Sequence, residues 1–201
     1  GTSFRAPIKI TPIAKFIEEN DKETMLFSFY IGIMGIIVLF CILLRLIFSK
    51  SSIYLLYGGY VLFGLLYMLD GLGLAFQYIF PNFPQIEKHF TYVLIQGLYL
   101  FLVLFTDKFF ENAKLQNWIR FFIILTSISI FSILINLIKY PIFYNFQWKF
   151  TIIILSMGCL LTLLITIKNF KKNKLKSILF LSGNTLVIAL SLLLSISYFV
   201  N

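Results

Sequence analysis

Six long apolar segments run through this chain, and they limit its fold more than any other feature. Each has about 17 to 25 mostly apolar residues, the length with which an α-helix crosses the hydrocarbon core of a bilayer. None alternates with period two, as the strands of a membrane β-barrel do. The sequence therefore predicts an all-α polytopic transmembrane bundle. Its six helices are expected at about 25–48, 53–78, 90–110, 118–138, 149–168 and 177–200.

Lysine and arginine fall mostly into every second loop. The loops after the second and fourth segments hold only Lys88, Lys139 and Lys149. Because short basic loops stay in the cytoplasm, the basic loops are predicted to be cytoplasmic and both termini extracytoplasmic, N-out and C-out. The basic residues of the other three loops are Arg45, Lys50, Lys108, Lys114, Arg120, Lys168, Lys171, Lys172, Lys174 and Lys176.

The composition excludes several classes of function. The chain is 60% hydrophobic and 12% charged, with a net charge of +9 that topology and attraction to anionic lipid explain without any nucleic-acid partner. The phosphate-binding, dinucleotide-binding and zinc-protease motifs are absent from the sequence. The single histidine, His89, is expected to be solvated in the loop between the second and third segments. We expect no catalytic residue, no cofactor and no metal site, and hence no enzyme.

Polar side chains inside the apolar segments are the candidate site residues. Asp70 is the only acid within a predicted helix core, and a charge there must be paired, hydrated or protonated. Helical spacing places Tyr67, Asp70 and Gln77 on one face of the second helix. The same reasoning places Tyr92, Gln96 and Tyr99 together on the third helix, and Asn184 on a polar stripe of the sixth.

Three interpretations of these polar residues remain open. The first is plain interhelical hydrogen bonding, the second is an outward-facing pocket whose occupancy or protonation at Asp70 biases the bundle, and the third is proton transport. Glycines in the first two helices, such as Gly32, Gly59 and Gly71, indicate either tight packing within one bundle or the seam of a homodimer. The lysines from Lys168 to Lys176 are expected to anchor a loop at the membrane surface, or else to contact a cytoplasmic domain.

Several short runs of the sequence occur in a characteristic order. They resemble the bacterial seven-transmembrane receptors with diverse intracellular signalling modules. The resemblance covers most of the chain and is best from Phe27 to Phe110. The runs are Phe29–Ile33, Tyr54–Tyr57, Gly71, Gln77–Pro81 and Leu104–Phe110.

The resemblance implies a domain plan and a function. Residues 1–24 are expected to be an extracytoplasmic linker at the end of a sensor domain, and 25–201 a multi-pass domain of the bacterial inner membrane. Such receptors sense an extracytoplasmic ligand and carry a seventh helix and a fused or associated cytoplasmic signalling domain, which we expect beyond residue 201. The function implied is relay of an extracytoplasmic stimulus to that output module.

Two alternatives come from other classes of protein. A small transporter or channel subunit predicts internal symmetry and helices broken at a binding site. The first three segments do not repeat in the last three, and no proline interrupts a predicted helix core. A scaffold subunit of a larger membrane complex is the third reading, and continuation of the reading frame into a signalling domain separates it from a receptor.

Overall fold

Helices make up nearly all of the structure that can be described. The computed structural model describes residues 13–48, 51–74, 77, 81, 84–111, 115–138 and 144–185, and these contain no strand. A sixth helix occupies 174–185, and its predicted continuation to residue 200 lies outside the described residues. The prediction of an all-α bundle is confirmed. The first five helices are α1 (Ile13–Ile47), α2 (Ile53–Gly71), α3 (Pro84–Phe110), α4 (Gln116–Ile138) and α5 (Tyr144–Phe170).

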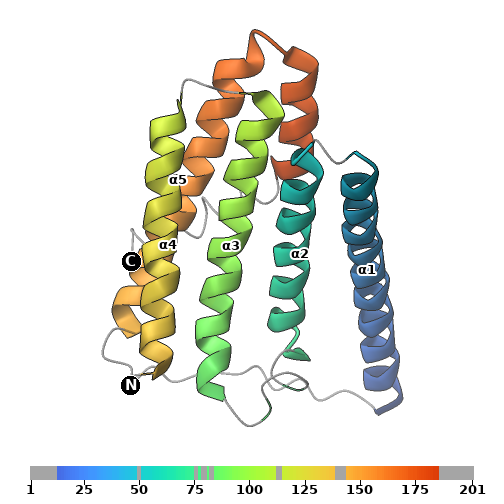
Figure 1. The fold of residues 1–201 in the computed structure, drawn as a ribbon. Coiled ribbons are helices and arrows are strands. Elements are labelled where there is room, and N and C mark those ends of the chain that lie inside the picture. The colour runs from blue at the N-terminus through green and yellow to red at the C-terminus, as the bar shows by residue number, and fades with distance from the viewer. Residues whose placement is uncertain are drawn as a thin grey trace.

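Five of these helices are long and apolar enough to cross a membrane. Consecutive helices run in opposite directions, so the chain passes up and down the bundle (Figure 1). The protein is therefore a multi-pass membrane protein, as predicted. The spans are Met25–Ile47, Ile53–Gly71, His89–Phe110, Gln116–Ile133 and Gln147–Phe170.

The alternating directions give the bundle two chemically different ends. The basic end is where α1, α3 and α5 finish, at the top of Figure 1, and Arg45, Lys108, Arg120 and Lys168 lie in the terminal turns there. The polar end is the opposite one, where α2 finishes and α3 and α5 begin. The loops that are rich in lysine and arginine thus share one end.

Several helices extend beyond the predicted apolar cores. α1 starts at Ile13, so the charged second half of the expected 1–24 linker is helical and continuous with the first span. α3 starts at Pro84 instead of residue 90, with proline at the first helical position, where its missing N–H costs nothing. α5 starts at Tyr144 instead of 149. Hydrophobic residues mark only the part of a helix that lies in the hydrocarbon core. The backbone hydrogen bonds of the helix continue beyond them into the membrane–water interface.

The second helix is shorter than predicted. α2 ends at Gly71, and Gly73 adopts a left-handed φ of 73°. The N–H of Gly73 donates to the carbonyl oxygen of Asp70 at 2.9 Å, which closes the last turn as in a Schellman-type end. Glycine reaches this conformation without the steric cost that a Cβ brings. The helix predicted over 53–78 is therefore interrupted after Gly71, and the break at 72–73 separates Gln77 from the face of α2, although Leu74 and Gln77 are again helical.

α3 is the central helix of the bundle. Among the described helices it packs against α2, α4 and α5, whereas the main contact of α1 in this part of the chain is with α2. The described side chains of α1 are correspondingly exposed, apart from partly buried positions and the buried Cys41. In a bilayer this apolar surface faces lipid. Lipid chains are as apolar as leucine, so the exposure of these side chains to lipid has no free-energy cost.

Two phenylalanine rings fill the contact between α2 and α3. The ring of Phe63 lies against Gly97, the ring of Phe101 lies against Gly59, and the two rings stack with centroids 5.3 Å apart. A methyl group built on Gly97 would lie 2.8 Å from Cζ of Phe63 and nearer still to Cδ1 and Cε1. The glycines of this interface are thus explained by close helix packing.

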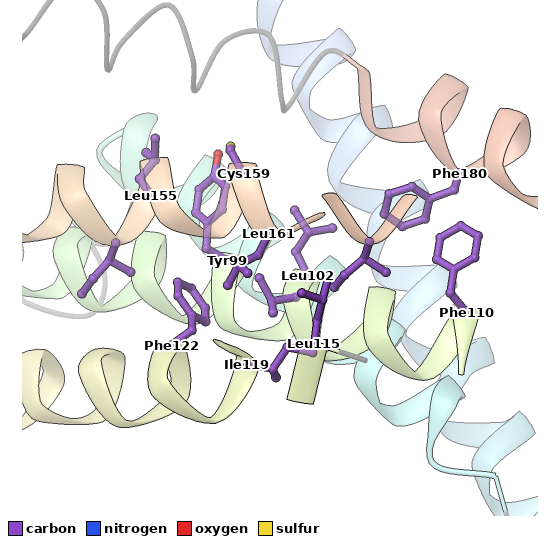
Figure 2. Packing of buried hydrophobic residues seen from close by; sticks show 13 residues of the cluster. Tyr99, Leu102, Phe110, Leu115, Ile119, Phe122, Leu155, Cys159, Leu161 and Phe180 are labelled. Carbon is purple, nitrogen blue, oxygen red and sulfur yellow. The ribbon is translucent and has the colours of Figure 1, made fainter. Parts of the chain in front are cut away.

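The apolar core lies where α3, α4 and α5 meet (Figure 2). Phe122 of α4 and Tyr99 of α3 both approach Gly158 of α5, and a methyl group there would lie 3.1 to 3.2 Å from their rings. Cys41 and Cys159 are buried free thiols that pack among apolar side chains.

Candidate interhelical polar site

Most buried hydroxyl groups in the bundle are satisfied within their own helix. Thr106, Thr126 and Thr166 each donate to the carbonyl oxygen four residues earlier, at 2.6 to 2.8 Å. A hydroxyl that donates within its own helix needs no acceptor from a neighbouring helix. The informative residues are those whose polar side chains bond across helices.

The first such contact joins α2 to α3 at the polar end. The hydroxyl of Thr91 donates to Oδ2 of Asp70 at 2.5 Å, and Asp70 is only 7% exposed. Asp70 is the last residue but one of α2, and Thr91 lies two turns into α3. The end of α2 is therefore held on α3 by a polar contact as well as by apolar packing.

The second set joins α3 to α5. Nδ1 of His89 lies 3.1 Å from Oε1 of Gln147, and Nε2 of Gln96 donates to Oγ1 of Thr151 at 2.9 Å. Between these two pairs the ring of Tyr92 packs against that of Trp148, with centroids 6.0 Å apart. An amide oxygen only accepts, so in this arrangement Nδ1 of His89 carries the proton. We call these six side chains the α3–α5 ladder.

The two sets lie on opposite faces of α3. Thr91 is two residues from His89, which corresponds to a rotation of about 200° at 3.6 residues per turn. His89 and Gln96 are seven residues apart, nearly two full turns, and so share the face toward α5. At the polar end α3 is thus held from two sides.

Three buried polar atoms of these side chains have no hydrogen-bond partner among the described residues. They are Oδ1 of Asp70, Oε1 of Gln96 and Nε2 of Gln147. All three residues are at least nine-tenths buried. Unpaired buried polar atoms are unusual in proteins, so each of them calls for an explanation. Because these three accompany polar contacts between helices, Asp70 and the α3–α5 ladder together are the candidate functional site.

An aromatic cluster connects α3 to the sixth helix at the basic end. Phe180 of the sixth helix is 5% exposed and contacts three rings of α3, with centroids 5.6 to 6.2 Å away. Figure 2 shows Phe180 facing Phe110. The three α3 rings of this aromatic cluster are Phe105, Phe109 and Phe110.

Two polar contacts support the same docking. The hydroxyl of Tyr60 on α2 donates to Oδ1 of Asn184 at 3.1 Å, and Asn184 also donates to the carbonyl oxygen of Phe180. Nζ of Lys176 lies 5.8 Å from the ring centroid of Phe109, within the range of a cation–π contact. The sixth helix therefore rests on both α2 and α3.

The structure separates the residues that the sequence grouped together. Asp70 is buried at the polar end and Gln96 is buried halfway along α3, where its side chain bonds to α5 and not to α2, and Tyr92 lies in the ladder. Tyr99 belongs to the apolar core beside Cys159 (Figure 2). Asn184 contacts Tyr60, which lies ten residues, or about 15 Å, along α2 from Asp70. Tyr67 is 39% exposed and Gln77 is exposed, so neither joins a buried cluster.

Sequence reasoning missed five residues of the site. His89 was expected in a solvated loop, but it is helical and 7% exposed. Thr91, Gln147, Trp148 and Thr151 were not singled out. The seven-residue spacing of His89 and Gln96 and the four-residue spacing of Gln147 and Thr151 carry the signal, since each spacing places a pair on one helix face. This spacing signal was missed because the predicted starts of the two helices, residues 90 and 149, lie after His89 and Gln147.

The predicted surface lysines are exposed. Lys168 lies in the last turn of α5, Lys171 and Lys172 lie in the following turn, and Lys174 and Lys176 lie in the first turn of the sixth helix. All five side chains are exposed at the basic end. Their role at the membrane surface stays a prediction. No group of three or more His, Cys, Asp or Glu side chains that suits a metal ion occurs in the described part of the chain.

The fold and its polar contacts define a polytopic helical membrane protein whose central helix is held by polar groups at one end and by aromatic rings at the other. Comparison with known families shows which family the chain belongs to. The family model described as "7TM diverse intracellular signalling" matches residues 23–200, and the chain belongs to that family. No curated protein and no solved structure matches the chain. The protein is thus a membrane domain of a seven-transmembrane signalling receptor family.

Proposed function

We propose that this domain relays an extracytoplasmic stimulus to a cytoplasmic output module through movement of α3. The observation that carries the proposal is that α3 bears the α3–α5 ladder near one end and the aromatic cluster at the other. A helix of 27 residues is about 40 Å long, so this single element links the two ends of the bundle. Family membership supports a signalling role, and the chain itself is proposed to do no catalysis.

The orientation of the relay follows from charge. The basic end faces the cytoplasm in this proposal, because basic loops are retained on that side of the bacterial inner membrane. The polar end then faces the extracytoplasmic side, where a ligand, a sensor domain or the 1–24 linker can reach it. Lys168 to Lys176 lie on the output side, close to anionic lipid or to a fused or associated signalling domain.

The mechanism is a choice between two packing arrangements of α3. Interhelical hydrogen bonds in membranes contribute only about 0.6 kcal/mol each, so the ladder can exchange partners at modest cost. A stimulus that favours one arrangement shifts the population by its differential binding to the two. Because Phe105, Phe109 and Phe110 are part of the same helix, a shift of α3 repositions Phe180 and the sixth helix.

A reversible lock between α3 and α5 tests the relay. Gln96 and Thr151 are hydrogen-bonded neighbours, so cysteines are introduced at both positions in a background without Cys41 and Cys159, and disulfide formation is verified by loss of maleimide reactivity on oxidation. In the full-length receptor we expect the oxidised lock to fix the output activity at one level, and reduction to restore its normal range. The Gln96→Cys single variant is the control. Equal output in oxidised and reduced protein would refute the relay through α3.

Labelling tests the orientation independently. Gln77 and Lys172 are both exposed and belong to opposite ends of the bundle. A cysteine at position 77 should react with an impermeant maleimide added to intact spheroplasts. A cysteine at position 172 should react only after the membrane is permeabilised. The reverse pattern would invert the proposed direction of signalling.

A further inference from the structure

Asp70 occupies an electrostatically unfavourable position. It is the last residue but one of α2, so its carboxylate lies at the negative end of the helix dipole, where acids are disfavoured. Its side chain is only 7% exposed, so water does little to compensate the charge. A carboxylate placed here needs a positive charge or a proton nearby.

The described neighbours of Asp70 satisfy only half of the carboxylate. Oδ2 accepts the hydrogen bond from Thr91, whereas Oδ1 is buried without a partner in the part of the chain that the structure describes. No Lys, Arg or His nitrogen of a described residue forms an ion pair with it. The free carboxylate oxygen and the last carbonyl groups of α2 are both acceptors, so both favour a cation.

We propose that the polar end of α2 binds a singly charged cation at Oδ1 of Asp70. The ligand is a cation with a single positive charge that oxygen atoms can bind. It is either an alkali-metal ion, which oxygen atoms coordinate, or the protonated amine of a small molecule, which donates hydrogen bonds to them. A single carboxylate balances one charge, and a divalent ion would require a richer acidic set than the described residues provide. This inference goes beyond the proposed relay and holds whether or not α3 carries a signal.

Such a cation would tie α2 to α3. Asp70 holds Thr91 through Oδ2 while Oδ1 holds the ion, so bound cation and interhelical hydrogen bond share one carboxylate. A ligand that binds only the folded protein raises its resistance to unfolding as the ligand concentration rises above the dissociation constant. The site is therefore detectable without knowledge of any signalling output.

The experiment uses the chain in phosphatidylcholine nanodiscs at constant ionic strength. Sodium, lithium, potassium or methylammonium chloride replaces tetraethylammonium chloride, and tryptophan fluorescence reports the midpoint of thermal unfolding. We expect a saturable rise of several degrees with at least one small cation. The alkali-metal arms and the methylammonium arm distinguish a metal-ion site from an amine site.

Matched variants locate the response. Asp70→Asn should abolish it or weaken the apparent affinity at least tenfold. Asp107→Asn, the same change at the basic end, where Oδ1 of Asp107 is also buried without a described partner, should leave it intact. If Asp70→Asn does not fold, Asp70→Glu replaces it and should change the apparent affinity several-fold.

Two results would overturn the proposal. One is a wild-type midpoint that does not respond to any of the small cations. In that case, a Lys88→Gln variant that loses as much stability as Asp70→Asn would show that the chain supplies the charge itself. The other is an unchanged response in the Asp70 variants.

Discussion

Gly97 offers a direct test of how α2 and α3 are held together. A Gly97→Ala substitution adds one methyl group, which would lie 2.8 Å from Cζ of Phe63 and nearer to two other ring atoms. Ordinary contacts of a Cβ begin at about 3.4 Å, so the ring or the helix must move. Phe63 cannot swing away freely, because its other face stacks on Phe101.

The magnitude follows from two opposing terms. Overpacking a tight contact costs about 1–3 kcal/mol. Replacing glycine by alanine inside a helix gains about 1 kcal/mol of helix propensity. The net effect of Gly97→Ala is then a loss of up to about 2 kcal/mol. At Gly32 on α1 a methyl group would meet nothing within 4 Å. Gly32→Ala therefore has no overpacking cost and gains only the helix propensity of alanine.

Reversible unfolding in mixed micelles measures both variants. We expect Gly97→Ala to be less stable than Gly32→Ala by about 1–3 kcal/mol, which is the overpacking term alone. Adding Phe63→Leu to Gly97→Ala should recover part of the loss, because the shorter side chain vacates the methyl position. Equal stability of the two alanine variants would show that the ring does not fill the space above Gly97, and would refute the interlocked interface.

Three further substitutions probe the polar and aromatic contacts. Gln96→Leu should change stability by less than about 1 kcal/mol, since it loses one weak bond to Thr151 but also removes an unpaired buried oxygen; a larger loss in the same unfolding assay would make Gln96 a structural anchor. Phe180→Ala should cost about 3 kcal/mol through the cavity left among three rings, and increased protease cleavage near the sixth helix would report its undocking. Tyr60→Phe removes only the hydroxyl that bonds Asn184 and should cost about 0.6 kcal/mol, so a loss as large as that of Phe180→Ala would contradict the dominance of ring packing.

The ranges of the helices show how far hydrophobicity alone can predict. The apolar cores located the five spans of the described residues, because lipid requires a continuous apolar surface and internal backbone hydrogen bonding. Helix ends were less predictable. Pro84 and Tyr144 begin α3 and α5 well before the apolar residues, and Gly73 ends α2 before Gln77. Local backbone geometry and interfacial residues set these ends, and hydropathy is insensitive to both.

Some residues of the candidate site could be predicted from the sequence, but the contacts between them could not. Asp70 and Gln96 stood out because polar side chains are costly in an apolar segment. Their partners did not, because threonine and glutamine near a helix end are ordinary residues there. Tyr67 was assigned inward from spacing to Asp70, yet it is 39% exposed. Spacing along one helix shows which residues share a face, but not which neighbour that face meets.

The amino-acid sequence by itself determined the solvent, five of the six predicted crossings and the collection of basic residues at one end, since each depends on local composition and on the alternation of consecutive helices. Only the tertiary structure decided that α3 is central, that Thr91 and His89 bond to different helices, and that Phe180 docks on the far end of α3. These features depend on rotations and contacts between helices distant in sequence. Lipid supplies no hydrophobic drive to select among such contacts, so close packing and a few polar groups select them.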